Sequence, residues 1–135
     1  MMDKRLKNEG FYRKVFLVAA LYDFILGFFF FAFFHAIFDQ ILKIPYPNYP
    51  GFYQASAAFI FNMGIGFYFV YRDIYRNIDI VKVGITFKLF YTGLAFFYVF
   101  VENMPWIFAL FGFLDLIFIV FFVFFLRAVR REVQA

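Results

Sequence analysis

Four long blocks of apolar residues, separated by short polar segments, dominate this sequence. Within each block the hydrophobic residues run around the whole helix, unlike the one-sided stripe of a soluble amphipathic helix. A bilayer core about 30 Å thick needs about 20 apolar residues at 1.5 Å per residue. The blocks reach this length and predict transmembrane helices at 15–34, 52–71, 80–101 and 106–126.

The connections between these blocks are short, which favours antiparallel neighbours. The first outer connection, 44–51, alternates proline with tyrosine and asparagine and predicts a stiff, extended segment. The second, 102–105, is long enough only to join two adjacent helices. The sequence therefore predicts an all-α fold, an integral membrane antiparallel four-helix bundle that forms a single transmembrane domain over residues 1–135.

Lysine and arginine are distributed unevenly among the polar segments. One outer connection carries Lys43 and the other carries no basic residue, whereas the remaining basic residues flank the opposite ends of the helices. By the positive-inside rule both termini are expected in the cytoplasm. We expect an integral protein of the plasma (inner) membrane of a prokaryote. The basic groups are Lys4, Arg5, Lys7, Arg13 and Lys14, then Arg72, Arg76 and Lys82, and finally Arg127, Arg130 and Arg131.

Composition supports the membrane assignment and narrows the chemistry. Of 135 residues, 66% are hydrophobic and 16% are charged, an apolar excess too large for one small soluble core. The 28 phenylalanines suit a lipid-facing surface, or else an aromatic pocket for a flat ligand. The absence of cysteine excludes thiol catalysis, and a single histidine excludes a histidine-rich metal site. The net charge of +4 suits anionic lipid, and nucleic-acid binding is not expected.

Each predicted helix carries one strongly polar residue near its centre. Counted from the basic ends of the helices, these residues lie roughly 14–18 Å deep, close to the bilayer midplane. In three helices the polar residue has small residues four positions before or after it, on the face suited to close helix packing. We therefore expect a polar cluster in the centre of the bundle, formed by Asp23, Asn62, Lys88 and Asp115.

Charge inside a bilayer is expensive, at about 2.5–3.5 kcal/mol per residue on insertion scales. Lys88 is therefore expected to pair with Asp115, with Asp23, or with both. Such a cluster has two interpretations. It either fixes the register of the helices, or it forms the polar end of a functional site, which is the default hypothesis for ionisable groups inside a membrane.

Three further polar residues lie on the outer side of the predicted bundle, namely His35, Asp39 and Glu102. Three such side chains are able to bind a metal, but their spacing matches no ligand motif. We interpret them as solvated interfacial residues. The sequence predicts no metal site, no catalytic residue and no cofactor, although a lipid or a quinone is a possible ligand.

The stretch Tyr22-Asp23-Phe24-Ile25-Leu26-Gly27 and the helices that carry Lys88 and Asp115 resemble the DoxX-like group of small four-helix membrane proteins. The resemblance is architectural and covers nearly the whole chain. It implies an N-in, C-in bundle and a role as partner subunit of a membrane oxidoreductase system. The sterol-isomerase-like four-helix group is a second comparison, but this chain lacks its helical histidine and glutamate pattern.

Three functional hypotheses follow. The first is a non-enzymatic accessory subunit that contacts the bilayer and either other membrane subunits or further copies of itself. The second is a lipid- or quinone-binding protein, or a proton-coupled carrier, that uses Asp23, Lys88 and Asp115 as the polar end of its site. The third is an intramembrane acid–base enzyme that uses Asp23 or Asp115.

Overall fold

The computed structural model describes residues 4–134, and these form helices joined by short loops with no β-strand among them. Four long helices coincide with the four predicted spans and extend beyond several of their ends. A short helix and one π-helix were not predicted. The elements are α1 (Glu9–Ala32), α2 (Phe34–Ala36), η1 (Ile37–Leu42), α3 (Pro50–Arg72), α4 (Ile78–Glu102) and α5 (Ile107–Glu132).

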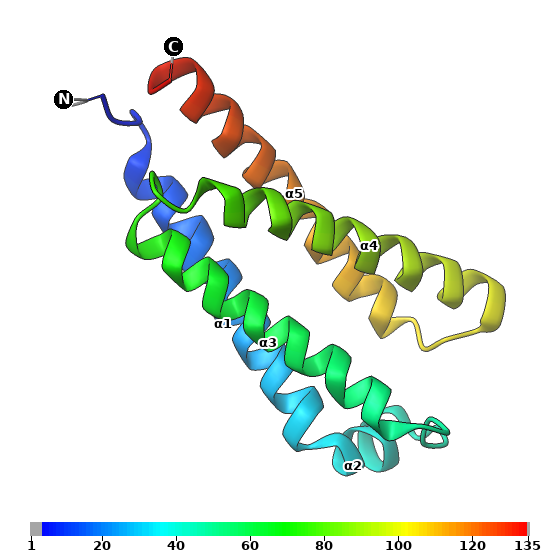
Figure 1. The fold of residues 1–135 in the computed structure, drawn as a ribbon. Coiled ribbons are helices and arrows are strands. Elements are labelled where there is room, and N and C mark those ends of the chain that lie inside the picture. The colour runs from blue at the N-terminus through cyan, green and yellow to red at the C-terminus, as the bar shows by residue number, and fades with distance from the viewer. Residues whose placement is uncertain (1–3, 135) are drawn as a thin grey trace.

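The long helices are arranged as two pairs. α1 packs mainly on α3, and α4 packs mainly on α5, while fewer contacts join one pair to the other. Both chain ends lie at the same end of the molecule, and the two pairs diverge toward the opposite end (Figure 1). We call the end that carries the termini the terminal end, and the other the splayed end.

The α1–α3 pair is held at very short range by two glycines. A Cβ atom added to Gly27 of α1 would lie 2.5 Å from the backbone nitrogen of Phe61, and one added to Gly64 of α3 would lie 2.8 Å from that of Phe24. Only a residue without a side chain allows the two backbones to approach so closely.

The main apolar core lies toward the terminal end and contains large side chains from all four long helices. Phe16 of α1, Phe67 of α3, Val81 of α4 and Phe122 of α5 are completely buried there. The rings of Phe16 and Phe122 stack with centroids 5.0 Å apart. This core joins the two helical pairs on the terminal side of the predicted midplane.

A smaller core closes the splayed end of the α1–α3 pair. Phe34 of α2, with Ile37 and Phe38 of η1, is buried there, and these residues pack against Tyr53 at the start of α3. η1 ends at Leu42 and is followed by Lys43, which adopts the left-handed conformation, and a loop then leads to Pro50 at the first turn of α3. The helical cap formed by α2 and η1 was not predicted, and the stiffness of the connection after it stays a prediction.

Within residues 4–134, α1, α4 and α5 are long and apolar enough to cross a membrane. Gln54, Ser56 and Asn62 lower the mean hydropathy of α3, which does not join this group. These three helices expose large apolar side chains, including Phe28, Phe90 and Phe113. Length, composition and exposed surface together indicate a membrane protein. The fourth span, the closed bundle and the cytoplasmic termini stay predictions.

Candidate functional site

A buried ionic cluster joins the two helical pairs. The Nζ atom of Lys88 on α4 lies 2.7 Å from Oδ1 of Asp115 on α5 and 3.5 Å from Oδ1 of Asp23 on α1. The lysine side chain is completely buried, and the carboxylates are exposed by only 2% for Asp23 and 6% for Asp115. The sequence left open whether Lys88 pairs with Asp115, with Asp23 or with both, and the structure shows contacts with both carboxylates. The shorter contact lies within the α4–α5 pair, and the longer one connects that pair to α1.

Aromatic rings surround the ammonium group on the sides that the carboxylates leave open. Nζ of Lys88 lies 5.0 Å from the ring centroid of Phe118, 5.4 Å from that of Tyr22 and 5.5 Å from that of Phe67. Cation–π attraction adds to the ion pairs at such distances. The ammonium is thus enclosed by protein groups, as expected for a charge held inside a membrane.

Two polar atoms beside the ammonium are less well satisfied. Oδ2 of Asp23 and the hydroxyl of Tyr22 are buried without a hydrogen-bond partner in the described chain. One turn farther along α4, the Thr92 hydroxyl donates to the Gly112 carbonyl at 3.2 Å, which links α4 to α5. The cluster is anchored more firmly on the α4–α5 side than on the α1 side.

Asn62 does not belong to this cluster, and the prediction that placed it there is wrong. Asn62 is exposed, whereas the buried positions of α3 are Ala57, Gly64, Phe67 and Val70. A neutral amide has a smaller desolvation cost than a charge, so it is not forced toward a counter-charge. The close approach of α3 to α1 instead selects Ala57 and Gly64 for the packing face.

The outer polar residues also remain separate. His35, Asp39 and Glu102 are all exposed, and no group of three metal-ligating side chains occurs within residues 4–134. Asp39 instead accepts a hydrogen bond from the hydroxyl of Tyr46, and this bond raises the pKa of Tyr46 above its ordinary value. The ring of His35 lies edge-on to the same tyrosine, with centroids 5.1 Å apart. These contacts order the outer segment.

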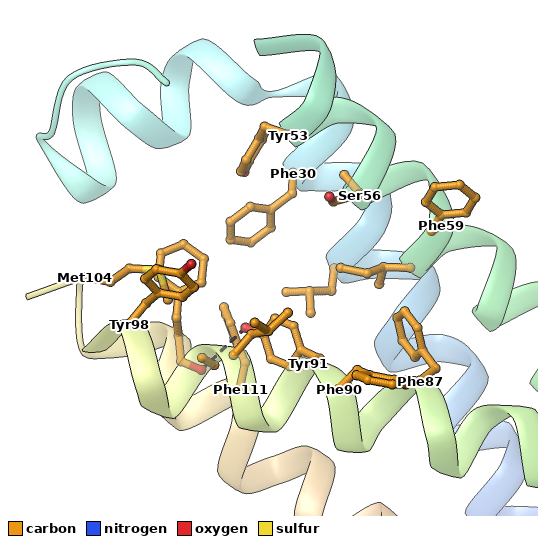
Figure 2. A pocket seen from close by; sticks show the side chains of 16 residues that line it. Phe30, Tyr53, Ser56, Phe59, Phe87, Phe90, Tyr91, Tyr98, Met104 and Phe111 are labelled. Carbon is orange, nitrogen blue, oxygen red and sulfur yellow. Dashed lines mark hydrogen bonds between the residues drawn. The ribbon is translucent and has the colours of Figure 1, made fainter. Parts of the chain in front are cut away.

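A cleft of about 460 Å³ lies between the two helical pairs at the splayed end. Figure 2 shows side chains of the α1–α3 pair facing those of the α4–α5 pair across it. Its lining is almost entirely aromatic or aliphatic: Leu26, Phe30, Tyr53, Ser56, Ala57, Phe59, Ile60, Phe87, Phe90, Tyr91, Leu94, Ala95, Tyr98, Met104, Phe108 and Phe111.

The ionic cluster borders this cleft but does not line it. Asp23, Lys88 and Asp115 are absent from the lining, which includes Leu26 and Tyr91, each about one turn farther toward the splayed end. The three charged residues therefore do not form the polar end of the cleft, contrary to the second hypothesis. They sit beside the point at which the helical pairs begin to diverge.

One polar atom of the cleft has no protein partner. The hydroxyl of Tyr53 is buried and makes no hydrogen bond within residues 4–134, although the residue lines the cleft. Tyr91, by contrast, donates to the Phe108 carbonyl at 3.4 Å. The sequence did not single out Tyr53, because it is one of 10 tyrosines and its partnerless state is visible only in three dimensions.

Comparison with known proteins adds no family to this description. No known family model matches the chain, and neither the curated proteins nor the solved structures contain a match. The resemblance to DoxX-like proteins stays a prediction. Any function must be argued from the cleft, the ionic cluster and the charged surfaces themselves.

Proposed function

We propose that this chain is a non-enzymatic membrane protein that binds one apolar molecule from the bilayer between its two helical pairs. The cleft at the splayed end carries this proposal. Its volume of about 460 Å³ falls in the range of about 300–1,000 Å³ that is usual for ligand sites. Its lining is suited to hydrocarbon or to a flat ring system. The cleft opens toward the space that lipid would fill around the splayed helices.

The ligand best suited to this cleft has an apolar body and an acceptor oxygen at one end. Leu26, Ile60 and Phe87 line the part of the cleft nearest the ionic cluster and offer no polar side-chain atom. Tyr53 lies at the splayed end, where its hydroxyl lacks a partner. An ester or ketone oxygen placed there would satisfy that donor, and the hydrocarbon would extend toward the midplane. This matches the orientation of a lipid in the leaflet opposite the termini.

In this proposal the ionic cluster has a structural role and holds the two helical pairs together. It ties α1 to the α4–α5 pair where the cleft ends, and its atoms are enclosed. Because Asp23 and Asp115 are buried and neither lines the cleft, a molecule bound there would contact neither acid, which argues against the acid–base enzyme. The accessory-subunit hypothesis is compatible with a ligand-binding cleft and stays a prediction, as does the N-in, C-in orientation in a prokaryotic inner membrane.

Filling the cleft is expected to abolish retention of the ligand. Ser56 is exposed, lines the cleft and bonds only to its own helix, so Ser56→Trp should occupy the space without disturbing the core. Ala55→Trp is the matched control, since Ala55 is exposed and lies outside the lining. Native mass spectrometry of protein released from lipid nanodiscs should show one bound lipid-sized molecule for the wild type and Ala55→Trp. Equal retention by Ser56→Trp would contradict the proposal.

Removing only the Tyr53 hydroxyl tests the polar end of the site. Tyr53→Phe keeps the ring and should weaken retention of the ligand about three- to tenfold, the loss expected for one neutral hydrogen bond. Folding should be unharmed, because the hydroxyl has no protein partner within residues 4–134. Tyr49→Phe, at an exposed tyrosine outside the cleft, is the control. Unchanged retention by Tyr53→Phe would show that the site binds hydrocarbon alone.

A further inference from the structure

A second hollow, of about 270 Å³, lies at the terminal end of the molecule. It is far more polar than the cleft, and its walls come from the segment before α1, from α1 itself, from the end of α3 and from the α3–α4 loop. We call it the basic pocket. The charged residues in its lining are Arg5, Glu9, Arg13, Arg72 and Asp73.

The walls of the basic pocket are held by contacts between distant parts of the chain. The backbone nitrogen of Leu6 donates to the hydroxyl of Tyr75 at 3.0 Å, and that of Lys7 donates to Oε1 of Glu132 at 3.0 Å. The Leu6 side chain is buried in the main core. The segment before α1 is therefore fixed between the α3–α4 loop and the end of α5, so the pocket has a defined shape.

Both acids of the pocket already have partners. Oε1 of Glu9 lies 3.3 Å from a guanidinium nitrogen of Arg5. Oδ1 of Asp73 accepts hydrogen bonds from the backbone nitrogens of Tyr75 and Arg76, each at 3.1 Å. The carboxylates thus serve the local structure and leave the two arginines of α1 and α3 without an acidic partner.

Those two arginines keep unused donors. Nε of Arg13 donates to the Tyr71 carbonyl at 3.1 Å, and its guanidinium lies 5.0 Å from the Tyr71 ring centroid, which leaves its two terminal amino groups available. Arg72 is exposed and has no side-chain hydrogen bond or ion pair within the described chain. Guanidinium groups bind phosphate oxygens in pairs of parallel hydrogen bonds.

We infer that the basic pocket binds the phosphate of an anionic phospholipid, with Arg13 and Arg72 as its donors. The pocket lies where the apolar lengths of α1 and α3 end, which is the depth of lipid phosphates in a bilayer. Most of the other basic side chains of the protein are at the same end, so the local potential favours an anion. This inference does not depend on a ligand in the cleft, because the two hollows lie at opposite ends of the molecule.

The test is binding of short-chain phosphatidylglycerol to the protein in uncharged detergent micelles, followed by thermal shift or native mass spectrometry. We expect phosphatidylglycerol to bind in preference to phosphatidylcholine, and Arg72→Gln to weaken its binding about tenfold, as for a lost charge-assisted hydrogen bond. Arg130→Gln should retain most of the affinity, because Arg130 is an exposed arginine at the same end but outside the pocket.

Three results would overturn the inference. Equal losses in Arg72→Gln and Arg130→Gln would indicate diffuse attraction between the lipid and the basic surface. Inorganic phosphate that binds as tightly as phosphatidylglycerol would assign the pocket to a soluble anion. No preference for phosphatidylglycerol over phosphatidylcholine would remove the site. Because the Arg72 side chain makes no hydrogen bond or ion pair within residues 4–134, Arg72→Gln is expected to fold normally, and its melting temperature without lipid checks this.

Discussion

Replacing Lys88 with methionine is expected to destabilise the protein by about 3–5 kcal/mol, the usual result of breaking a buried ion pair from one side. The ammonium is completely buried and, within residues 4–134, is the one cation that contacts both Asp23 and Asp115. Lys88→Met removes it and leaves two carboxylates without a counter-charge. The folded fraction after size-exclusion chromatography in mild detergent, and the melting temperature, measure the effect.

Removal of the carboxylates together with the lysine should restore folding. Lys88→Met combined with Asp115→Leu is expected to recover only part of the loss, because Asp23 also contacts Lys88 and would stay unpaired. Addition of Asp23→Leu gives a fully apolar replacement, which is often neutral or stabilising. If Lys88→Met alone were as stable as the wild type, the cluster would not be what holds the two helical pairs together. Retention of ligand by a well-folded triple variant would further separate the cluster from the cleft.

The ionic cluster could be predicted from the sequence because an unpaired charge inside a membrane has a high free-energy cost. An ammonium and two carboxylates at one depth in apolar helices have few alternatives to pairing. Asn62 is neutral, so no need for a counter-charge determines its position. Its spacing from Ala58 and Gly66 resembled a packing face, but Ala57 and Gly64 are the buried small residues of α3. Small residues lie on two faces of α3, and only the contact with α1 shows which of these faces is buried.

The cleft and the basic pocket could not be predicted, because each depends on how the helical pairs are placed. Four apolar segments of similar length predict helices that pack along their full length. The sequence of no single segment predicts that the two helical pairs diverge. The phenylalanine content is compatible with an aromatic pocket, but composition alone does not indicate which residues line it. In the sequence, the arginines of the basic pocket indicate only the orientation of the chain. Their arrangement around a hollow depends on tertiary contacts such as the hydrogen bond from the Leu6 backbone nitrogen to the Tyr75 hydroxyl.

The helical cap formed by α2 and η1 was missed for a different reason. Phe34, Ile37 and Phe38 are apolar, but the segment is too short to span a bilayer and stands directly after a span. Its burial against Tyr53 is a tertiary contact with the start of α3. That contact shields the hydroxyl that lacks a partner, so the missed element also shapes the proposed site.

Gly27→Ala is expected to destabilise the protein by about 1–3 kcal/mol, in the range measured for overpacked cores. The new Cβ atom would lie 2.5 Å from the Phe61 nitrogen and 2.8 Å from the Ala57 carbonyl oxygen. Both atoms belong to the backbone of α3, so no side-chain rotation can relieve the clash and the helices must separate. Gly27→Leu should prevent the α1–α3 pair from forming, with a loss of folded protein on chromatography.

Gly93→Ala is the matched control, because a Cβ atom there meets nothing within 4 Å. This change should be neutral or stabilise α4 by about 0.5–1 kcal/mol, since alanine is the better helix former. Equal melting temperatures for Gly27→Ala and Gly93→Ala would contradict the close packing of α1 on α3. Ala57 both touches Gly27 and lines the cleft. Separation of α1 from α3 should therefore also reduce ligand retention in Gly27→Ala, while Gly93→Ala keeps it.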